Sequence, residues 1–98
     1  MNLYLISQDD NRGYDTHDSA VVAAENEEAA KCIHPGYMDY TWNDDSECWQ
    51  HQLLDGSTHR VDYGSTWARH IKYVKVELLG KAVKGTVAGV ILSSFNAG

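Results

Sequence analysis

Two cysteines and two histidines stand at spacings that a zinc site could use. Cys32-x-His34 and Cys48-x-x-His51 supply four soft or borderline ligands, the number that zinc takes in a structural site. The second spacing is common among zinc ligands, but one residue between Cys32 and His34 is less usual. Cys32 also falls in the apolar stripe of an expected helix, where a free cysteine packs as a small hydrophobe. One hypothesis is therefore a metal- or small-ligand-binding module that uses Cys32, His34, Cys48 and His51.

Groups for hydrolytic chemistry are present but form no recognisable motif. Cys48 with His51 or His59 supplies a thiol and a base, yet no nucleophile motif surrounds Cys48. The adjacent acids Asp44 and Asp45 point in diverging directions on most backbones, which suits a solvated turn. The sequence contains no phosphate-binding loop and no GxGxxG pattern. We therefore expect no enzymatic activity and no cofactor.

The segment 37–49 and the loop 13–18 combine aromatic and acidic residues. Tryptophan and tyrosine are frequent at interface hot spots, and acids beside them favour a basic partner. The competing interpretation is structural: the tryptophans supplement a small core, and the acids of the loop cap local turns. The residues expected to contact a partner are Tyr14, Asp15, Tyr37, Asp39, Tyr40, Trp42, Asp44, Asp45, Glu47 and Trp49.

The N-terminal third predicts two strands and a helix. Residues 2–8 and 19–24 have the period-two alternation of strands. Asn26 suits a helix N-cap, with acids in the first turn, and Pro35 ends the helix after about two turns. So short a helix requires packing on a sheet.

The C-terminal third predicts two more strands, at residues 71–79 and 86–95. Between the two thirds, the sequence around Asp55-Gly56-Ser57 indicates a hairpin turn, and the residues before it are expected to form an irregular loop. The order β-β-α-insert-β-β implies one α+β domain over residues 1–98. It has a mostly antiparallel four-stranded sheet with one short helix. The open edges and uncovered apolar surface of such a sheet predict a homodimer.

The charge and composition of the chain limit the classes of partner that it can bind. The chain has 98 residues and a net charge of −6. Residues 1–59 hold twelve of its fourteen acids and only Arg12 and Lys31 as cations, while residues 60–98 are net positive. The acidic part would repel nucleic acid, so no direct nucleic-acid binding is expected. No apolar run reaches the length of a membrane span, and no signal peptide is expected, which favours a cytoplasmic location.

The ends of the chain resemble a family of short, mostly uncharacterised bacteriophage and prophage proteins. The resemblance rests on LYLISQ (3–8), GYDT (13–16), DSAVVAA (18–24), the 27–35 helix, VKVELLG (74–80) and the closing VILSSFNAG (90–98). It covers somewhat over half of the chain and implies phage origin and a compact α+β fold. For a phage protein the expected cytoplasmic location is the host cytoplasm. The resemblance implies no catalytic residue. Small acidic phage proteins resemble, as a class, inhibitors of host machinery or antiviral defence, anti-CRISPR proteins included. The leading hypothesis is therefore a phage protein that binds a host protein or complex.

Overall fold

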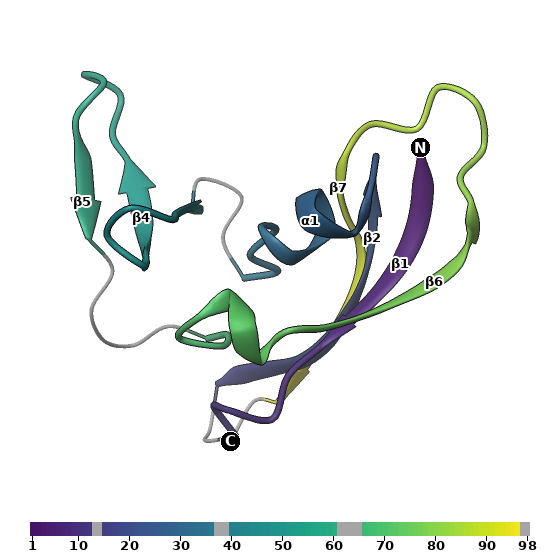
Figure 1. The fold of residues 1–98 in the computed structure, drawn as a ribbon, viewed down its shortest axis with the longest axis horizontal. Helices are drawn as coiled ribbons and strands as arrows, with labels where there is room; N and C mark the ends of the chain where they lie inside the picture. Colours follow the sequence, from purple (N-terminus) through teal and green to yellow (C-terminus); the bar gives the residue numbers. More distant parts are fainter. Residues whose placement is uncertain (13–14, 37–39, 61–65, 97–98) are drawn as a thin grey trace.

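The computed structural model describes residues 1–12, 15–36, 40–60 and 66–96 and contains two antiparallel sheets (Figure 1). The larger sheet has four strands in the order β6-β1-β2-β7. Its strands are β1 (Asn2–Ser7), β2 (Thr16–Ala24), β6 (Lys75–Lys81) and β7 (Gly89–Asn96). The smaller sheet has three strands in the order β3-β4-β5. Its strands are β3 (Tyr40–Asn43), β4 (Cys48–Gln52) and β5 (Thr58–Arg60).

The predicted α+β class is confirmed, with one short helix against a four-stranded antiparallel sheet. The helix α1 (Glu27–Lys31) begins where its cap predicts, because the Asn26 Oδ1 accepts a hydrogen bond from the Ala29 backbone N–H at 2.8 Å. The predicted hairpin is also present. Leu53 N–H donates to the Ser57 carbonyl at 2.8 Å. Gly56 has φ +88°, a left-handed backbone that glycine adopts without steric cost.

Five sequence expectations on the course of the chain were wrong. The second strand begins at Thr16, three residues earlier than expected, and the helix ends at Lys31, before its expected end at Pro35. Residues 40–43, expected within an irregular loop, form β3, which pairs with β4. Residues 71–73, expected at the start of a strand, form a 3₁₀ turn, η1 (Ile71–Tyr73). The His70 Nδ1 accepts the Lys72 backbone N–H at 3.0 Å and so competes with strand pairing there. The last strand begins at Gly89, three residues later than expected.

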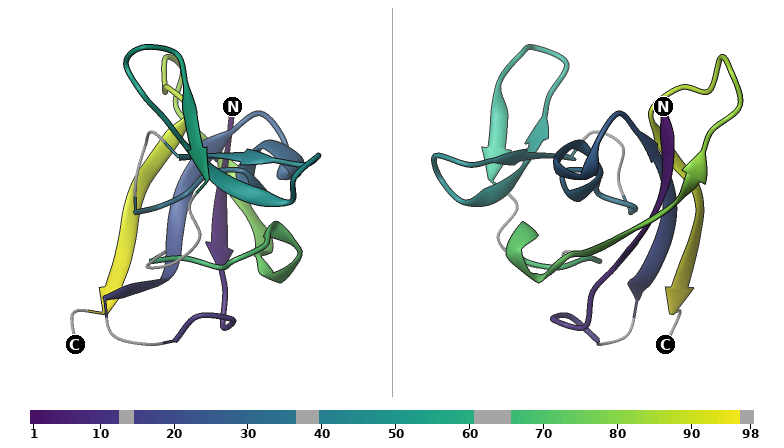
Figure 2. Two further views of the ribbon diagram at one scale, coloured as in Figure 1. Left: turned by 90° about the vertical axis from the view of Figure 1, so that its left-hand side faces the viewer. Right: turned by 45° about the vertical axis from the view of Figure 1, so that its right-hand side comes forward.

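The core lies between the two sheets, with α1 on the same side of the large sheet as the small one (Figure 2). Alternate residues of β1 and β2 face inward, among them Tyr4, Ile6 and Val22. Trp49 from β4 and Trp67 from the segment before η1 fill the space opposite them, and each is 1 % exposed or less. One apolar cluster therefore joins both sheets.

Candidate functional site

The inner face of the small sheet is aromatic because side chains alternate between the two faces of a strand, and every second residue of β3 and β4 on this face has a ring. Trp42 on β3 lies opposite Trp49 on β4, and Tyr40 lies opposite His51. The rings of Trp42 and Trp49 meet edge to face with centroids 5.4 Å apart. The Trp49 indole Nε1–H donates to the Ala68 carbonyl at 2.8 Å. Trp49 is thus a core residue, and its predicted contact with a partner does not fit this burial.

His34 lies buried behind this aromatic face. Its ring is edge-on to those of Tyr40 and Trp49, with centroid distances of 5.0 and 4.9 Å. Its Nδ1 accepts the Gly36 backbone N–H at 3.1 Å, which leaves the proton of the neutral ring on Nε2. Burial, with a smaller contribution from the charge of His17, lowers the pKa of His34 to about 4. His34 is therefore a neutral core residue near pH 7.

The turn between β3 and β4 carries three exposed acids. Its residues Asp44, Asp45 and Glu47 are all exposed. The Trp42 indole Nε1–H donates to Asp44 Oδ1 at 2.7 Å, and the Asn43 side chain accepts the Ser46 backbone N–H at 3.1 Å. These two hydrogen bonds fix the shape of the turn from within.

His70 extends this surface from a distant part of the chain. Its ring meets the Trp42 ring with centroids 4.7 Å apart, and its Nε2 lies 3.4 Å from Glu47 Oε1. We call Trp42, Asp44, Asp45, Glu47 and His70 the acidic turn surface. His70 was not predicted, because no sequence pattern linked residue 70 to the 42–47 segment. The alternation Tyr40-x-Trp42 and Trp49-x-His51 would have revealed the β3–β4 pair.

The two segments predicted to contact a partner do not form one surface. Asp15 is exposed, with φ +58°, immediately before β2. The start of β2 and the β3–β4 hairpin lie apart in every view (Figures 1 and 2). Tyr40 is half-buried against His34 and His51. The predicted contact residues Tyr14, Tyr37 and Asp39 lie outside the described residues.

The predicted metal ligands do not converge. All four belong to the described part of the chain, in which no three His, Cys, Asp or Glu side chains are grouped to hold a metal ion. The physical reason lies in β4, where Cys48 and His51 are three residues apart and so point to opposite faces of the strand. Cys48 is buried with its Sγ 3.2 Å from the Ser46 Oγ, and His34 is enclosed by aromatic rings. The zinc hypothesis for these residues is therefore wrong.

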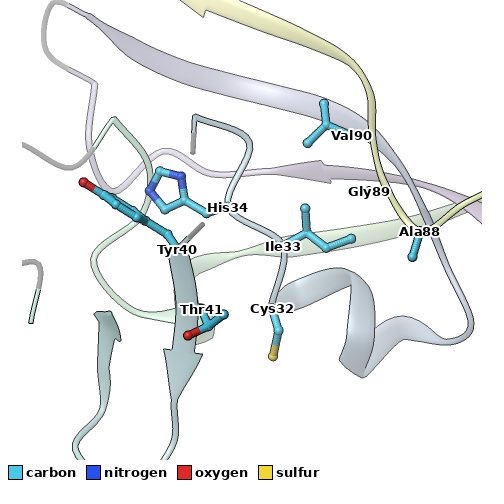
Figure 3. Close-up of a pocket in the computed structure, with 8 residues that line it drawn as sticks. All are labelled: Cys32, Ile33, His34, Tyr40, Thr41, Ala88, Gly89 and Val90. Atoms are coloured by element: carbon cyan, nitrogen blue, oxygen red, sulfur yellow. The ribbon is translucent and has the colours of Figure 1, made fainter. Parts of the chain in front are cut away.

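A cavity of about 270 Å³ lies between the end of α1, β3 and the start of β7 (Figure 3). Its wall is mostly apolar, with the Cys32 thiol and the Thr41 hydroxyl among its polar groups. Desolvation and the nearby Asp44 and Glu28 carboxylates raise the pKa of the Cys32 thiol. The thiol is thus protonated near pH 7 and is a poor nucleophile. The lining residues are Cys32, Ile33, His34, Tyr40, Thr41, Ala88, Gly89 and Val90.

No family model, no curated protein and no solved structure matches this chain. The described residues contain no helix that is both long and apolar enough to span a membrane.

Proposed function

We propose that this chain is a non-enzymatic phage protein that binds a positively charged surface of a host protein or complex through the acidic turn surface. The phage origin, the host cytoplasm as its location and a role as an inhibitor of antiviral defence, as in anti-CRISPR proteins, rest on the sequence resemblance alone. The observation that carries the binding role is the ordered acidic turn. Three exposed carboxylates belong to one hairpin, and Trp42 and His70 contact two of them, Asp44 and Glu47.

The geometry suits a protein partner for two reasons. The turn is held by its own hydrogen bonds, so binding would cost little additional ordering of the backbone. The three exposed acids of the β3–β4 turn lie in the part of the sequence that holds twelve acids and two cations, and a local negative charge accelerates encounter with a basic surface. Trp42 is half-buried and lies beside these acids, where an aromatic side chain adds apolar contact area.

The test begins with capture of a partner from bacterial host lysate and continues with the purified complex. The Asp44→Ala/Asp45→Ala double variant should weaken binding about tenfold or more, because charged contacts at an interface contribute strongly to affinity. Trp42→Ala should weaken it as well. Affinity measured by calorimetry at low and high salt should show that the double variant has lost most of the salt dependence.

The matched control is Glu25→Ala/Glu27→Ala, which removes the same charge from exposed positions at the start of α1. This control should keep the wild-type affinity. If both turn variants fold and retain every partner and phenotype, the proposal is wrong. If the control weakens binding equally, net charge rather than the acidic turn surface governs the interaction, which also contradicts the proposal.

A further inference from the structure

Most of the exposed large apolar side chains that the structure describes belong to the two edge strands of the large sheet, β6 and β7, and to the connection between them. Among the described residues, nine large hydrophobic side chains are exposed, and six of them belong to β6, β7 or the connection between these strands. Val83 and Val87 in the connection are each 81 % exposed, and Leu92 on β7 is 68 % exposed. The full set of six is Leu78, Leu79, Val83, Val87, Ile91 and Leu92. Val87, Ile91 and Leu92 lie on β7 or just before it, and exposed apolar side chains along an uncovered strand edge indicate an interaction surface.

The two edges of the large sheet differ in charge. The β6 edge carries Lys75, Glu77 and Lys81, and charged side chains on an edge strand oppose pairing with another strand. The β7 edge has the sequence Gly-Val-Ile-Leu-Ser-Ser-Phe-Asn, with neither charge nor proline. Within the described residues β7 pairs with β2 alone, and it forms the outer edge of the molecule (left view of Figure 2). Its other backbone edge is therefore open to a further strand.

The register of β7 locates the part that can accept a strand. Val22 pairs with Val90 and Val21 with Leu92, so Ile91 is the extra residue of a bulge. A second register shift lies between His17 and Ser19, but its extra residue, Asp18, belongs to β2. The part of β7 without an extra residue of its own is therefore residues 92–96. Leu92 shares its face with Val21, on the side of the sheet away from α1.

We propose that two copies of this chain associate through β7, antiparallel to each other around a two-fold axis. The two four-stranded sheets then form one eight-stranded sheet. In such an arrangement each residue faces a residue of the same segment, so an uncharged strand meets no like charge. Self-pairing of β6 about its centre would instead set Lys75 opposite Lys81.

Pairing through β7 keeps the acidic turn surfaces of the two copies apart, while Asp15 and Asp18 at the start of β2 lie one strand away from residues 95–96. The chain carries −6 overall, so two copies repel each other unless their acidic regions stay apart. The small sheet, which bears the acidic turn surface, lies across the core from the large sheet (Figure 1). Pairing through β7 therefore leaves both acidic turn surfaces exposed and distant from each other.

Five paired residues bury less area than the ~1,600 Å² of a standard stable interface. The exposed apolar side chains of Ile91, Leu92 and Val87 would add to that area. We therefore expect a dimer with a dissociation constant in the micromolar range.

Sedimentation velocity from about 5 to 500 µM tests this, since that range brackets a micromolar constant. The wild-type mass should rise from the 10.9 kDa of one chain toward twice that value. Ser94→Lys should remain monomeric, because self-pairing about the centre of residues 92–96 sets Ser94 of one copy opposite Ser94 of the other and so brings the two new charges together. Leu79→Lys on β6 is the control, being 51 % exposed, and should dimerise as the wild type does. A monomeric wild type over the whole range, or a dimer lost in Leu79→Lys but kept in Ser94→Lys, overturns the proposal.

Disulfide cross-linking provides a readout that does not depend on the effect of lysine on folding. Leu92→Cys, Ser93→Cys and Ser94→Cys are each introduced separately into a Cys32→Ser protein, which keeps only the buried Cys48. Under mild oxidation the variant whose new cysteine lies nearest the two-fold axis should form a covalent dimer. Glu77→Cys on β6 should not. If Glu77→Cys cross-links and none of the β7 variants does, the interface lies at β6 and the proposal is wrong. Cross-links at β7 would also distinguish a second copy from a strand of another protein.

Discussion

His34 shows how burial sets the chemistry of a single residue. Its side chain is 2 % exposed and is surrounded by Tyr40, Trp49 and the Gly36 N–H. A histidine in this setting is kept neutral, because burial removes the hydration that stabilises its charged form. His17 has its pKa lowered for the same reason, since burial outweighs the effect of Asp18. Both buried histidines therefore take up a proton only at a lower pH than an exposed histidine does.

We expect stability to fall as the pH drops from about 6.5 to about 4. In the unfolded chain His34 takes up a proton near pH 6.5, but in the folded chain it does so only near pH 4. The unfolded state thus binds more protons across that window, and the difference amounts to about 3 kcal/mol. Urea denaturation at several pH values should show this loss. His34→Gln should flatten the profile, whereas His59→Gln, an exposed control on β5, should keep it; equal profiles for all three proteins would contradict the assignment.

At the scale of one element, α1 depends on its cap and its packing. It has only five residues, too few for a stable isolated helix. Asn26 satisfies the Ala29 N–H, Glu27 and Glu28 lie at the positive end of the helix dipole, and Ala30 is fully buried against the core. The cap therefore contributes a large share of the local stability.

Asn26→Ala should lower the free energy of unfolding by about 1 kcal/mol, because the Ala29 N–H loses its partner. Asn26→Ser should retain most of the stability, since serine is also a good N-cap. Chemical denaturation of the three proteins measures both values. The interpretation fails if alanine and serine at this position are equally stable.

At the scale of the whole molecule, contacts between segments distant in sequence hold the two sheets together. Trp49 donates from β4 to the Ala68 carbonyl, and the Arg69 guanidinium and backbone reach Asp10. The two bonds from the Arg69 side chain to the Asp10 carboxylate are 2.8 and 3.1 Å long, and they hold the pKa of Asp10 below its usual range. The segment before η1 thus connects the loop after β1 to the small sheet.

We expect both sheets to unfold in one transition, because Trp49 and Trp67 belong to the same buried cluster as Ile6 and Val22. Tryptophan fluorescence, which reports on the small sheet and the core, and far-UV circular dichroism should give coincident denaturation curves. Trp49→Phe should shift both curves together by about 1–3 kcal/mol, because the Ala68 carbonyl loses its donor. Two separated transitions would show instead that the small sheet folds on its own.

Local patterns in the sequence were sufficient for the main elements of the fold. The alternation in β1 and β2, the Asn26 cap and the Asp55-Gly56-Ser57 turn depend on neighbouring residues, whose backbone preferences act without the rest of the chain. For the same reason the α+β class and the four-stranded sheet could be predicted. The acids of the β3–β4 turn were also recognisable as surface residues, because consecutive charged residues are rarely buried.

Only the tertiary structure decided which aromatic residues are core and which lie at the surface. Trp42 and Trp49 have similar sequence surroundings, yet Trp49 is buried under Ala68 while Trp42 lies beside Asp44 and His70. The two cysteines and two histidines of the zinc hypothesis were judged by their spacing alone, and the strand conformation of β4 turns Cys48 and His51 to opposite faces. These outcomes depend on contacts between distant segments, whose energies no local pattern contains.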